Sequence, residues 1–455
     1  MRPRVLMLQL LLVAGVLSPV GLAAARCLSG SNGGAMACYL VPPPDAVSEA
    51  TLGQRGEFGA SVAVTLDPAS GGALCAVGAP TAMSAGSPRG SVRLVALDGR
   101  DGSLRPCSRI GQGVVAPQGL SAHARFGAAV DLSKGSTGTL LAVGAPGANS
   151  AGGSRAGLVR LYSVAGSSSP GPMPIAELVD FNPEPGSDGA AFGASVAFRG
   201  DGKQLAVGAP SATAPAGPSL AGAVYVYGCE SGEWSLEFVA TAPAPSVAAT
   251  FGHAVGWVGD TLVVGSPGNG EIAPGAGRVY GFVGAGPQQG ELRWELAAPK
   301  TTGGAAGMRY GESLVAVDGS TLAIGGWGRG VVEVFKVPAS GDPVHRVLLR
   351  GDPTEGFGLR LAATPDRLFV GCPYAPGAGG ESGAGRLKVF ERSGSLWEPT
   401  GSLGSAEPSL NGEFGVALGA YTDGVNQAHV LVGEPGSNLA CRTELGCAAG
   451  AAFLY

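Results

Sequence analysis

A pair of short motifs, repeated seven times, constrains this chain more than any other feature. An aromatic-glycine pair is followed, within each repeat, by a run that ends in Gly-x-Pro, as in EFGASVAV (57–64) and AVGAP (76–80). Successive copies are 47 to 68 residues apart, and the aromatic residues are Phe58, Phe126, Phe192, Phe251, Tyr310, Phe357 and Phe414. Several strand-like runs in a repeat of this length are typical of a β-propeller, in which each repeat forms one blade.

Each repeat holds about four short apolar runs bounded by Gly and Pro, which predicts four strands per blade. In the third repeat these runs lie at 194–198, 205–207, 223–227 and 234–236. No sustained apolar period of 3.6 residues, the sign of an amphipathic helix, occurs after the N-terminal segment. We therefore predict an all-β, seven-bladed β-propeller with four antiparallel strands per blade.

The two ends of the chain indicate how the ring closes. The seventh repeat stops after its third run, residues 451–455, and lacks a fourth. The segment 37–44, ACYLVPPP, precedes the first repeat and is similar to the fourth runs elsewhere. We expect this N-terminal strand to complete the last blade, which would remove an open sheet edge.

On these motifs the chain resembles the FG-GAP β-propeller of the integrin α-subunit. The similarity covers residues 37–455, and related repeats also occur in secreted lectins and in a glycosylphosphatidylinositol-cleaving phospholipase. The resemblance implies a propeller that recognises an extracellular ligand. It also implies calcium in the hairpin between the first two strands of a blade, held by carboxylates at alternate positions as in DxDxDG.

The seven hairpins depart from that calcium pattern. Each offers a single aspartate, namely Asp67, Asp131, Asp201, Asp260, Asp318, Asp366 and Asp423. A calcium ion needs six or more oxygen ligands, so one carboxylate does not hold it tightly. We therefore predict no metal site and no cofactor, and we expect these aspartates to shape turns.

The N-terminal segment predicts secretion. Arg2 and Arg4 precede an apolar stretch, 5–16, and small residues follow at 21–25. This pattern is typical of a signal peptide, residues 1–25, cleaved after Ala25, with the propeller at 26–455; the apolar core is too short for a membrane anchor. Cleavage leaves 27 basic and 34 acidic residues, a net charge of −7, which argues against nucleic acid as a partner. No later run approaches the roughly 20 apolar residues of a membrane span.

The cysteines fit an oxidising compartment. All eight follow the predicted cleavage site. We predict two disulfides, Cys27–Cys38 and Cys441–Cys447, because each pair brackets a short loop. Cys75 aligns with core leucines and is expected to be a buried thiol. The state of Cys107, Cys229 and Cys372 is left open.

Signatures of catalysis are not found in the sequence. There is no GxSxG elbow, no HExxH helix and no phosphate loop ending in GK[ST], so we do not expect an enzyme. The tripeptide Arg199-Gly200-Asp201 is the one that integrins bind, but it falls in a predicted tight turn. Turn chemistry explains it without an adhesive role.

The segments before FG and after GAP form the ligand face in integrin propellers. Arg and aromatic residues gather there, and the fifth copy replaces GAP with GGW. The candidate ligand-binding residues are Arg55, Arg125, Arg309, Trp327, Arg329 and Tyr374. Exposed aromatic and Arg side chains suit a protein or an acidic glycan. The alternative is that the arginines pack on neighbouring loops and that Trp327 plugs the central channel.

The sequence favours a secreted binding module whose partner is an extracellular protein. One alternative is a lectin-like propeller that binds glycans. Another is a structural component of a matrix or cell wall, which the Gly-, Ala- and Pro-rich loops permit. The identity of the ligand and the oligomeric state are not predicted.

Overall fold

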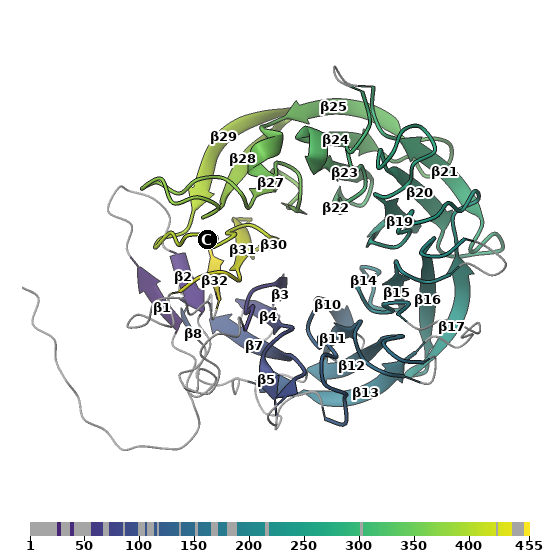
Figure 1. Cartoon of the computed structure of the whole chain (residues 1–455), viewed down its shortest axis with the longest axis horizontal. Helices are drawn as coiled ribbons and strands as arrows, with labels where there is room; N and C mark the ends of the chain where they lie inside the picture. The colour runs from purple at the N-terminus through teal and green to yellow at the C-terminus, as the bar shows by residue number, and fades with distance from the viewer. Residues whose placement is uncertain are drawn as a thin grey trace, which may run out of the picture.

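The protein is a closed ring of β-sheets. The computed structural model describes residues 25–28, 37–40, 56–66, 72–84, 87–98, 105–106, 113–115, 118–135, 138–150, 153–164, 172–179, 189–213, 218–300, 304–424, 426–438 and 450–455. The strands form seven antiparallel blades around a common axis (Figure 1). The predicted seven-bladed β-propeller is thus confirmed.

Blades 2 to 6 are built from consecutive strands, ordered in space as in the chain. Their bounds are β10 (Ala129–Gly135), β11 (Gly138–Ala145), β12 (Leu158–Val164) and β13 (Met173–Leu178); β14 (Ser195–Phe198), β15 (Gln204–Ala209), β16 (Ala223–Glu230) and β17 (Glu233–Ala240); β18 (Ala254–Val258), β19 (Thr261–Ser266), β20 (Arg278–Val283) and β21 (Leu292–Ala297); β22 (Ser313–Asp318), β23 (Thr321–Gly326), β24 (Val331–Lys336) and β25 (Val344–Arg350); β26 (Leu361–Ala363), β27 (Arg367–Cys372), β28 (Arg386–Ser393) and β29 (Leu396–Gly404).

Blade 1 departs from the four-strand rule. Its first three strands are β3 (Ser61–Leu66), β4 (Ala73–Ala79) and β7 (Ser91–Asp98). Two short strands, β8 (Arg105–Pro106) and β9 (Gly113–Val115), both pair with β7 and share the outer position. A separate two-stranded hairpin, β5 (Met83–Ser84) and β6 (Ser87–Pro88), lies in the loop before β7.

Burial within a blade explains the residue types of its strands. Every residue of β15, QLAVGA, is buried, because neighbouring blades cover both faces of this strand. The outer strand β17, EWSLEFVA, alternates between exposed and partly buried positions, as expected where one face meets solvent. The second strands therefore read as continuous small apolar runs, and the fourth strands read as mixed ones.

At each contact between blades, the glycine of a GAP-type motif in one blade lies against the glycine of the FG-type motif in the next blade. A Cβ atom on Gly208, in the third GAP motif, would overlap the carbonyl oxygen of Gly252, in the next FG motif. The same overlap recurs at the other six junctions, including Gly433 against the Gly59 carbonyl, which joins blade 7 to blade 1. Any larger residue would push the backbones of adjacent blades apart. The repeated glycines are therefore the means by which neighbouring blades come into contact.

The FG aromatic residues anchor these junctions. All seven are buried, and six of them form a backbone bridge to the glycine that precedes the third strand of the blade before. Phe357, at the start of blade 6, is the exception: its N–H donates to the Asp352 carbonyl at 3.4 Å instead. Asp352 precedes a 3-10 turn, Pro353–Glu355, which leads into Phe357 at this junction.

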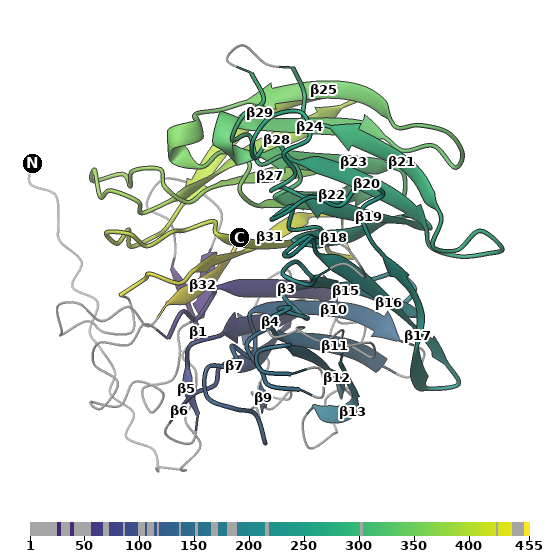
Figure 2. The ribbon, with the colours of Figure 1, turned by 45° about the vertical axis from the view of Figure 1, so that its right-hand side comes forward.

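The last blade closes the ring as predicted. It contains β30 (Ala417–Thr422), β31 (Ala428–Glu434) and β32 (Ala451–Leu454), and β2 (Ala37–Leu40) pairs with β32. Tyr39 lies opposite Phe453 in that pair. A fifth strand, β1 (Ala25–Leu28), was not predicted and adds to the outer side of β2 (Figure 1, Figure 2).

The N-terminal predictions are only partly within the described residues. Residues 1–24 lie outside them, so the signal peptide stays a prediction. Cys27 and Cys38 are direct cross-strand partners in the β1–β2 pair. Opposed residues of an antiparallel pair have a Cα separation compatible with a disulfide. The predicted Cys441–Cys447 disulfide lies outside the described residues, as does Cys107.

Candidate functional site

The inner strands of all seven blades surround an axial channel. At the FG end of the ring the channel holds a cavity of about 260 Å³, and a second cavity of about 400 Å³ follows along the axis. The FG-end cavity is lined by residues that stand one to three positions after each FG pair. In blades 1 to 3 the first of these are small: Ala60, Ala128 and Ala194, each followed by Ser or Ala.

Blades 4 to 6 replace these small residues with charged or ionisable ones. His253 and Glu312 directly follow the FG motifs of blades 4 and 5, and Arg360 stands one position later in blade 6. All three line the FG-end cavity. His253 Nε2 lies 3.0 Å from Glu312 Oε1, and Arg309 Nε lies 2.8 Å from Glu312 Oε2. We call His253, Arg309, Glu312 and Arg360 the mouth cluster.

Glu312 is the ionised centre of the mouth cluster. Its side chain is only 8% exposed, and burial alone would raise its pKa. The hydrogen bond and charge of His253, followed by the charges of Arg309 and Arg360, outweigh burial and lower the pKa of Glu312 to about 2. The carboxylate therefore keeps its negative charge throughout the physiological range.

The guanidinium of Arg360 has fewer hydrogen-bond partners than the carboxylate of Glu312. Burial lowers the pKa of its guanidinium, and the charge of Glu312 counteracts this in part. Among the described residues, its one hydrogen-bond partner is the carbonyl of the preceding residue, Leu359, at 2.8 Å from Nη1. A guanidinium carries five N–H donors, so most of the donors of Arg360 are available.

Beside the mouth cluster, the loops of blades 5 and 6 form a distinct rim. The connection between the second and third strands is only residues 327–330 in blade 5, the shortest of the seven, and contains the 3-10 turn η3 (Trp327–Arg329). A second turn, η4 (Pro353–Glu355), precedes Phe357. We call residues 327–330, η4 and Tyr374 the blade 5–6 rim.

Aromatic and Arg side chains gather on this rim. Trp327 and Tyr374 pack edge to face, with ring centroids 6.2 Å apart. Tyr374 is 43% exposed, whereas Trp327 is half-buried. Arg329 is exposed and donates to the Ala306 carbonyl at 3.0 Å. Trp327 lines neither of these two channel cavities.

The structure brings four of the six predicted ligand-binding residues together. Trp327, Arg329 and Tyr374 share the rim, and Arg309 lies next to it, turned towards Glu312. Arg125 is exposed in the loop before β10, in blade 2, which lies across the ring from blades 5 and 6 (Figure 1). It does not belong to this cluster. Arg55 lies outside the described residues.

Sequence reasoning missed three members of the mouth cluster. His253, Glu312 and Arg360 were not among the candidate residues predicted from the sequence. The available signal was the alignment of the positions after FG, where the first three repeats have only Ala and Ser. Charged residues in three successive blades at these positions converge on the axis, although they are far apart in the chain.

Two further buried carboxyl groups lie outside the mouth cluster. Glu434 is fully buried, and burial, opposed by one hydrogen bond from Ser405 at 2.7 Å, raises its pKa to about 8. Its other oxygen, Oε1, has no partner among the described residues. Glu333 accepts a hydrogen bond from the Tyr310 hydroxyl at 2.7 Å, and burial raises its pKa.

The hairpin aspartates contact protein groups, as expected of turn residues. Asp318 Oδ1 accepts from the Ser320 backbone N–H at 2.8 Å, and Asp423 Oδ1 accepts from that of Gln427 at 2.8 Å. Asp131 accepts from the Phe198 N–H of the next blade at 2.7 Å. Asp67 lies outside the described residues. In the part of the chain that the structure describes, no group of three or more His, Cys, Asp or Glu side chains could hold a metal ion.

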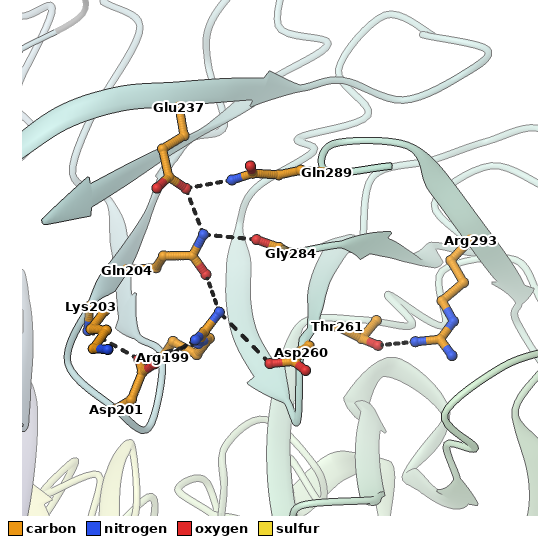
Figure 3. A network of polar contacts seen from close by, with 10 residues as sticks. All are labelled: Arg199, Asp201, Lys203, Gln204, Glu237, Asp260, Thr261, Gly284, Gln289 and Arg293. Carbon is orange, nitrogen blue, oxygen red and sulfur yellow. Dashed lines mark hydrogen bonds and ion pairs between the residues drawn. The ribbon is translucent and has the colours of Figure 1, made fainter. Parts of the chain in front are cut away.

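The Arg-Gly-Asp tripeptide is engaged within the protein. Arg199 pairs with its own Asp201 at 2.5 Å, donates to Gln204 at 2.7 Å and lies 3.7 Å from Asp260 of the next blade (Figure 3). Gln204 is buried and donates to Glu237 at 2.6 Å and to the Gly284 carbonyl at 2.8 Å. The arginine holds its own turn and orients Gln204, which hydrogen-bonds blade 4, and this agrees with the structural interpretation of the turn.

The remaining cysteines are thiols outside disulfides. Cys75 is fully buried in the core, as predicted. Cys372 is also buried, and Cys229 is half-buried. Neither belongs to the mouth cluster or the rim.

Fold and site together define a seven-bladed β-propeller with a charged mouth at one end of its channel. No family model matches the chain, and no curated protein matches it either. Within the described residues there is no helix of the length and apolarity that crossing a membrane requires.

Proposed function

We propose that this protein is a secreted, integrin-α-like propeller that acts as an extracellular recognition module, not as an enzyme, and that it binds a protein at the blade 5–6 rim. The repeated FG-GAP motifs and the N-terminal signal pattern support this proposal. The observation that carries it is the convergence of Trp327, Arg329 and Tyr374 where the repeat rule is broken. Local departures from a scaffold rule are more often functional than the positions that keep it.

The chemistry of the rim suits a protein surface. Buried aromatic and Arg side chains contribute most of the binding energy in protein interfaces. Tyr374 and Arg329 are exposed, and the ring of Trp327 packs against that of Tyr374. The exposed pair is therefore accessible to a partner.

The test compares capture of partners by two double variants. The full chain, immobilised, is incubated with extracellular material, and bound proteins are identified and titrated. We expect Trp327→Ala with Arg329→Ala to weaken the principal partner by about 2 kcal/mol or more, roughly 30-fold in Kd. A matched control, Leu396→Ala with Arg346→Ala, removes an exposed apolar residue and an exposed Arg from the outer strands of the same two blades.

Three outcomes would overturn parts of this proposal. Equal capture by wild type and rim variant would exclude the rim as the site. Normal capture with a lowered melting temperature would show that Trp327 is structural. Rim-dependent binding on a glycan array, without a protein partner, would favour the lectin alternative.

Secretion has its own test. Protein expressed with its native N-terminus in eukaryotic cells should appear in the medium with Arg26 as its first residue. Such cleavage leaves Arg26 and the rest of β1 in the mature chain. Retention inside the cell with residues 1–25 intact would contradict it.

A further inference from the structure

We propose that the mouth cluster is a binding site for a single carboxylate, that of an acidic side chain of the protein ligand, with Arg360 as the anion-binding group. This inference rests on the proposed function, because it names the chemistry by which a partner seated on the rim would reach into the channel. The rim and the mouth are adjacent: the N–H of Gly328 in the rim donates to the carbonyl of Met308, the neighbour of Arg309, at 3.2 Å.

The donors of Arg360 are the first reason. The side chain lines the cavity, and its guanidinium has one hydrogen-bond partner within the described residues. Arg offers a planar fork that matches the two oxygens of a carboxylate. The spare donors of this half-buried cation are accessible from the cavity, and a bound anion would supply both hydrogen bonds and charge.

The charge balance of the cluster is the second reason. Glu312 is its one carboxylate, and its two oxygens already face His253 and Arg309. The groups that act on Arg360 are Glu312 and Tyr374, and a tyrosine is neutral near pH 7. The two arginines therefore share one carboxylate, which leaves room for a second anionic group.

The serines of the cavity wall leave Arg360 as the donor for a ligand. The hydroxyls of three lining serines already donate to the next blade: Ser61 to Gly127, Ser195 to Gly252 and Ser313 to Gly358, at 2.7 to 2.8 Å. Each hydroxyl has one hydrogen to donate, so none of the three has a donor left for a ligand. A carboxylate that enters the cavity would therefore bind to the guanidinium of Arg360.

The experiment uses butyrate as the probe and butyramide as its uncharged isostere. Saturation-transfer NMR titrations on the full chain at pH 7 should show millimolar binding of butyrate and at least tenfold weaker binding of butyramide. Arg360→Gln should weaken butyrate at least tenfold, and Arg360→Lys should restore part of the loss. Arg346→Gln, on the outer strand β25, is the charge-matched control and should bind as wild type.

A second variant tests the site from the opposite side. Glu312→Gln removes the resident carboxylate, so butyrate should bind about tenfold more tightly, because it replaces the missing charge. Equal binding of butyrate and butyramide, or binding unaffected by Arg360→Gln, would overturn the proposal. Tighter binding of glucuronate than butyrate would overturn the choice of an acidic side chain over an acidic sugar.

The butyrate experiment and the protein-capture experiment can fail independently of each other. If butyrate fails to bind but protein capture depends on Trp327 and Arg329, only the carboxylate site is wrong. If butyrate binding depends on Arg360 but capture ignores the rim, the carboxylate site stands and the rim is wrong. If both hold, butyrate should compete with the captured protein.

Discussion

Two glutamates occupy positions where the first three repeats have alanine, and their surroundings drive their pKa values in opposite directions. Glu312 follows the FG motif of blade 5, and Glu434 replaces the alanine of GAP in blade 7. Both are buried. The pKa of Glu312 is lowered to about 2, and that of Glu434 is raised to about 8.

The difference lies in the neighbours that each carboxyl group meets. Glu312 faces His253 and Arg309, with Arg360 nearby, whereas Glu434 receives one hydroxyl hydrogen bond from Ser405. Burial disfavours both charged forms, but only the first is compensated. Replacement of a repeat alanine by glutamate thus gives an ionised group at the channel mouth in one case and a neutral acid within the last blade in the other.

The largest expected effect concerns Glu434. Its folded pKa lies above its ordinary value of 4.5, so its contribution to stability is full below pH 4.5 and is lost as pH rises through about 8. The wild type should lose on the order of 4 kcal/mol of unfolding free energy over that range relative to Glu434→Gln. Urea unfolding at pH 5 and pH 8.5 measures this, with the exposed Glu398→Gln as control. Parallel pH profiles for wild type and Glu434→Gln would refute the comparison.

Glu312 should show the opposite sign. Its folded pKa is below 4.5, so its contribution is present above that pH and is lost as pH falls towards 2. At pH 7, Glu312→Gln should lower the unfolding free energy by about 3 kcal/mol, because His253, Arg309 and Arg360 lose their counter-charge. At pH 3 the difference from wild type should shrink. A difference that is the same at both pH values would show that Glu312 acts through packing alone.

Glu333 is a third buried glutamate, and loss of its hydrogen-bond partner should have a smaller effect on stability. Tyr310 is the only non-phenylalanine among the seven FG aromatic residues, and its hydroxyl bonds Glu333, which also lies 3.3 Å from His345. Tyr310→Phe should cost about 1–2 kcal/mol, because it leaves a buried carboxyl oxygen unpaired. In a Glu333→Leu background the same change should cost little. Equal costs in both backgrounds would separate Tyr310 from Glu333.

The smallest expected effect is that of metal removal. The hairpin carboxylates contact backbone N–H groups and arginines, as Asp318 does with Ser320 and, at 2.8 Å, with Arg392. EDTA should therefore leave the melting temperature unchanged, since it removes nothing that stabilises the native state. A fall of several degrees that calcium reverses would show that these hairpins hold a metal after all.

The fold could be predicted from the sequence because the residues that repeat are those that the architecture requires in every blade. Glycines at both motifs permit the contact between blades, and the missing fourth run of the last repeat indicated that the segment 37–44 closes the ring. The fifth strand β1 and the split outer strand of blade 1 could not be predicted, because short pairings leave no periodic signal.

The candidate site was predicted only in part. Trp327 was singled out because it breaks the GAP pattern, and its contact with Tyr374 follows from their neighbouring blades. Arg125 was grouped with them because it occupies an equivalent loop, but equivalent loops lie around a ring rather than side by side. His253 and Arg360 are hard to recognise in the sequence, because they are far apart in the chain. Only the convergence of the inner strands brings them to one cavity.

The pairing of β2 with β32 also bears on how the chain is made. Blades 2 to 6 are each formed from one continuous stretch, so each can fold as it leaves the ribosome. The last blade combines β2, which precedes the first repeat, with β32 of the seventh repeat. A chain cut short before β32 would leave β2 without that neighbour and the ring with an exposed edge. Ring closure therefore has to wait until β32 has been made, whereas blades 2 to 6 do not depend on it.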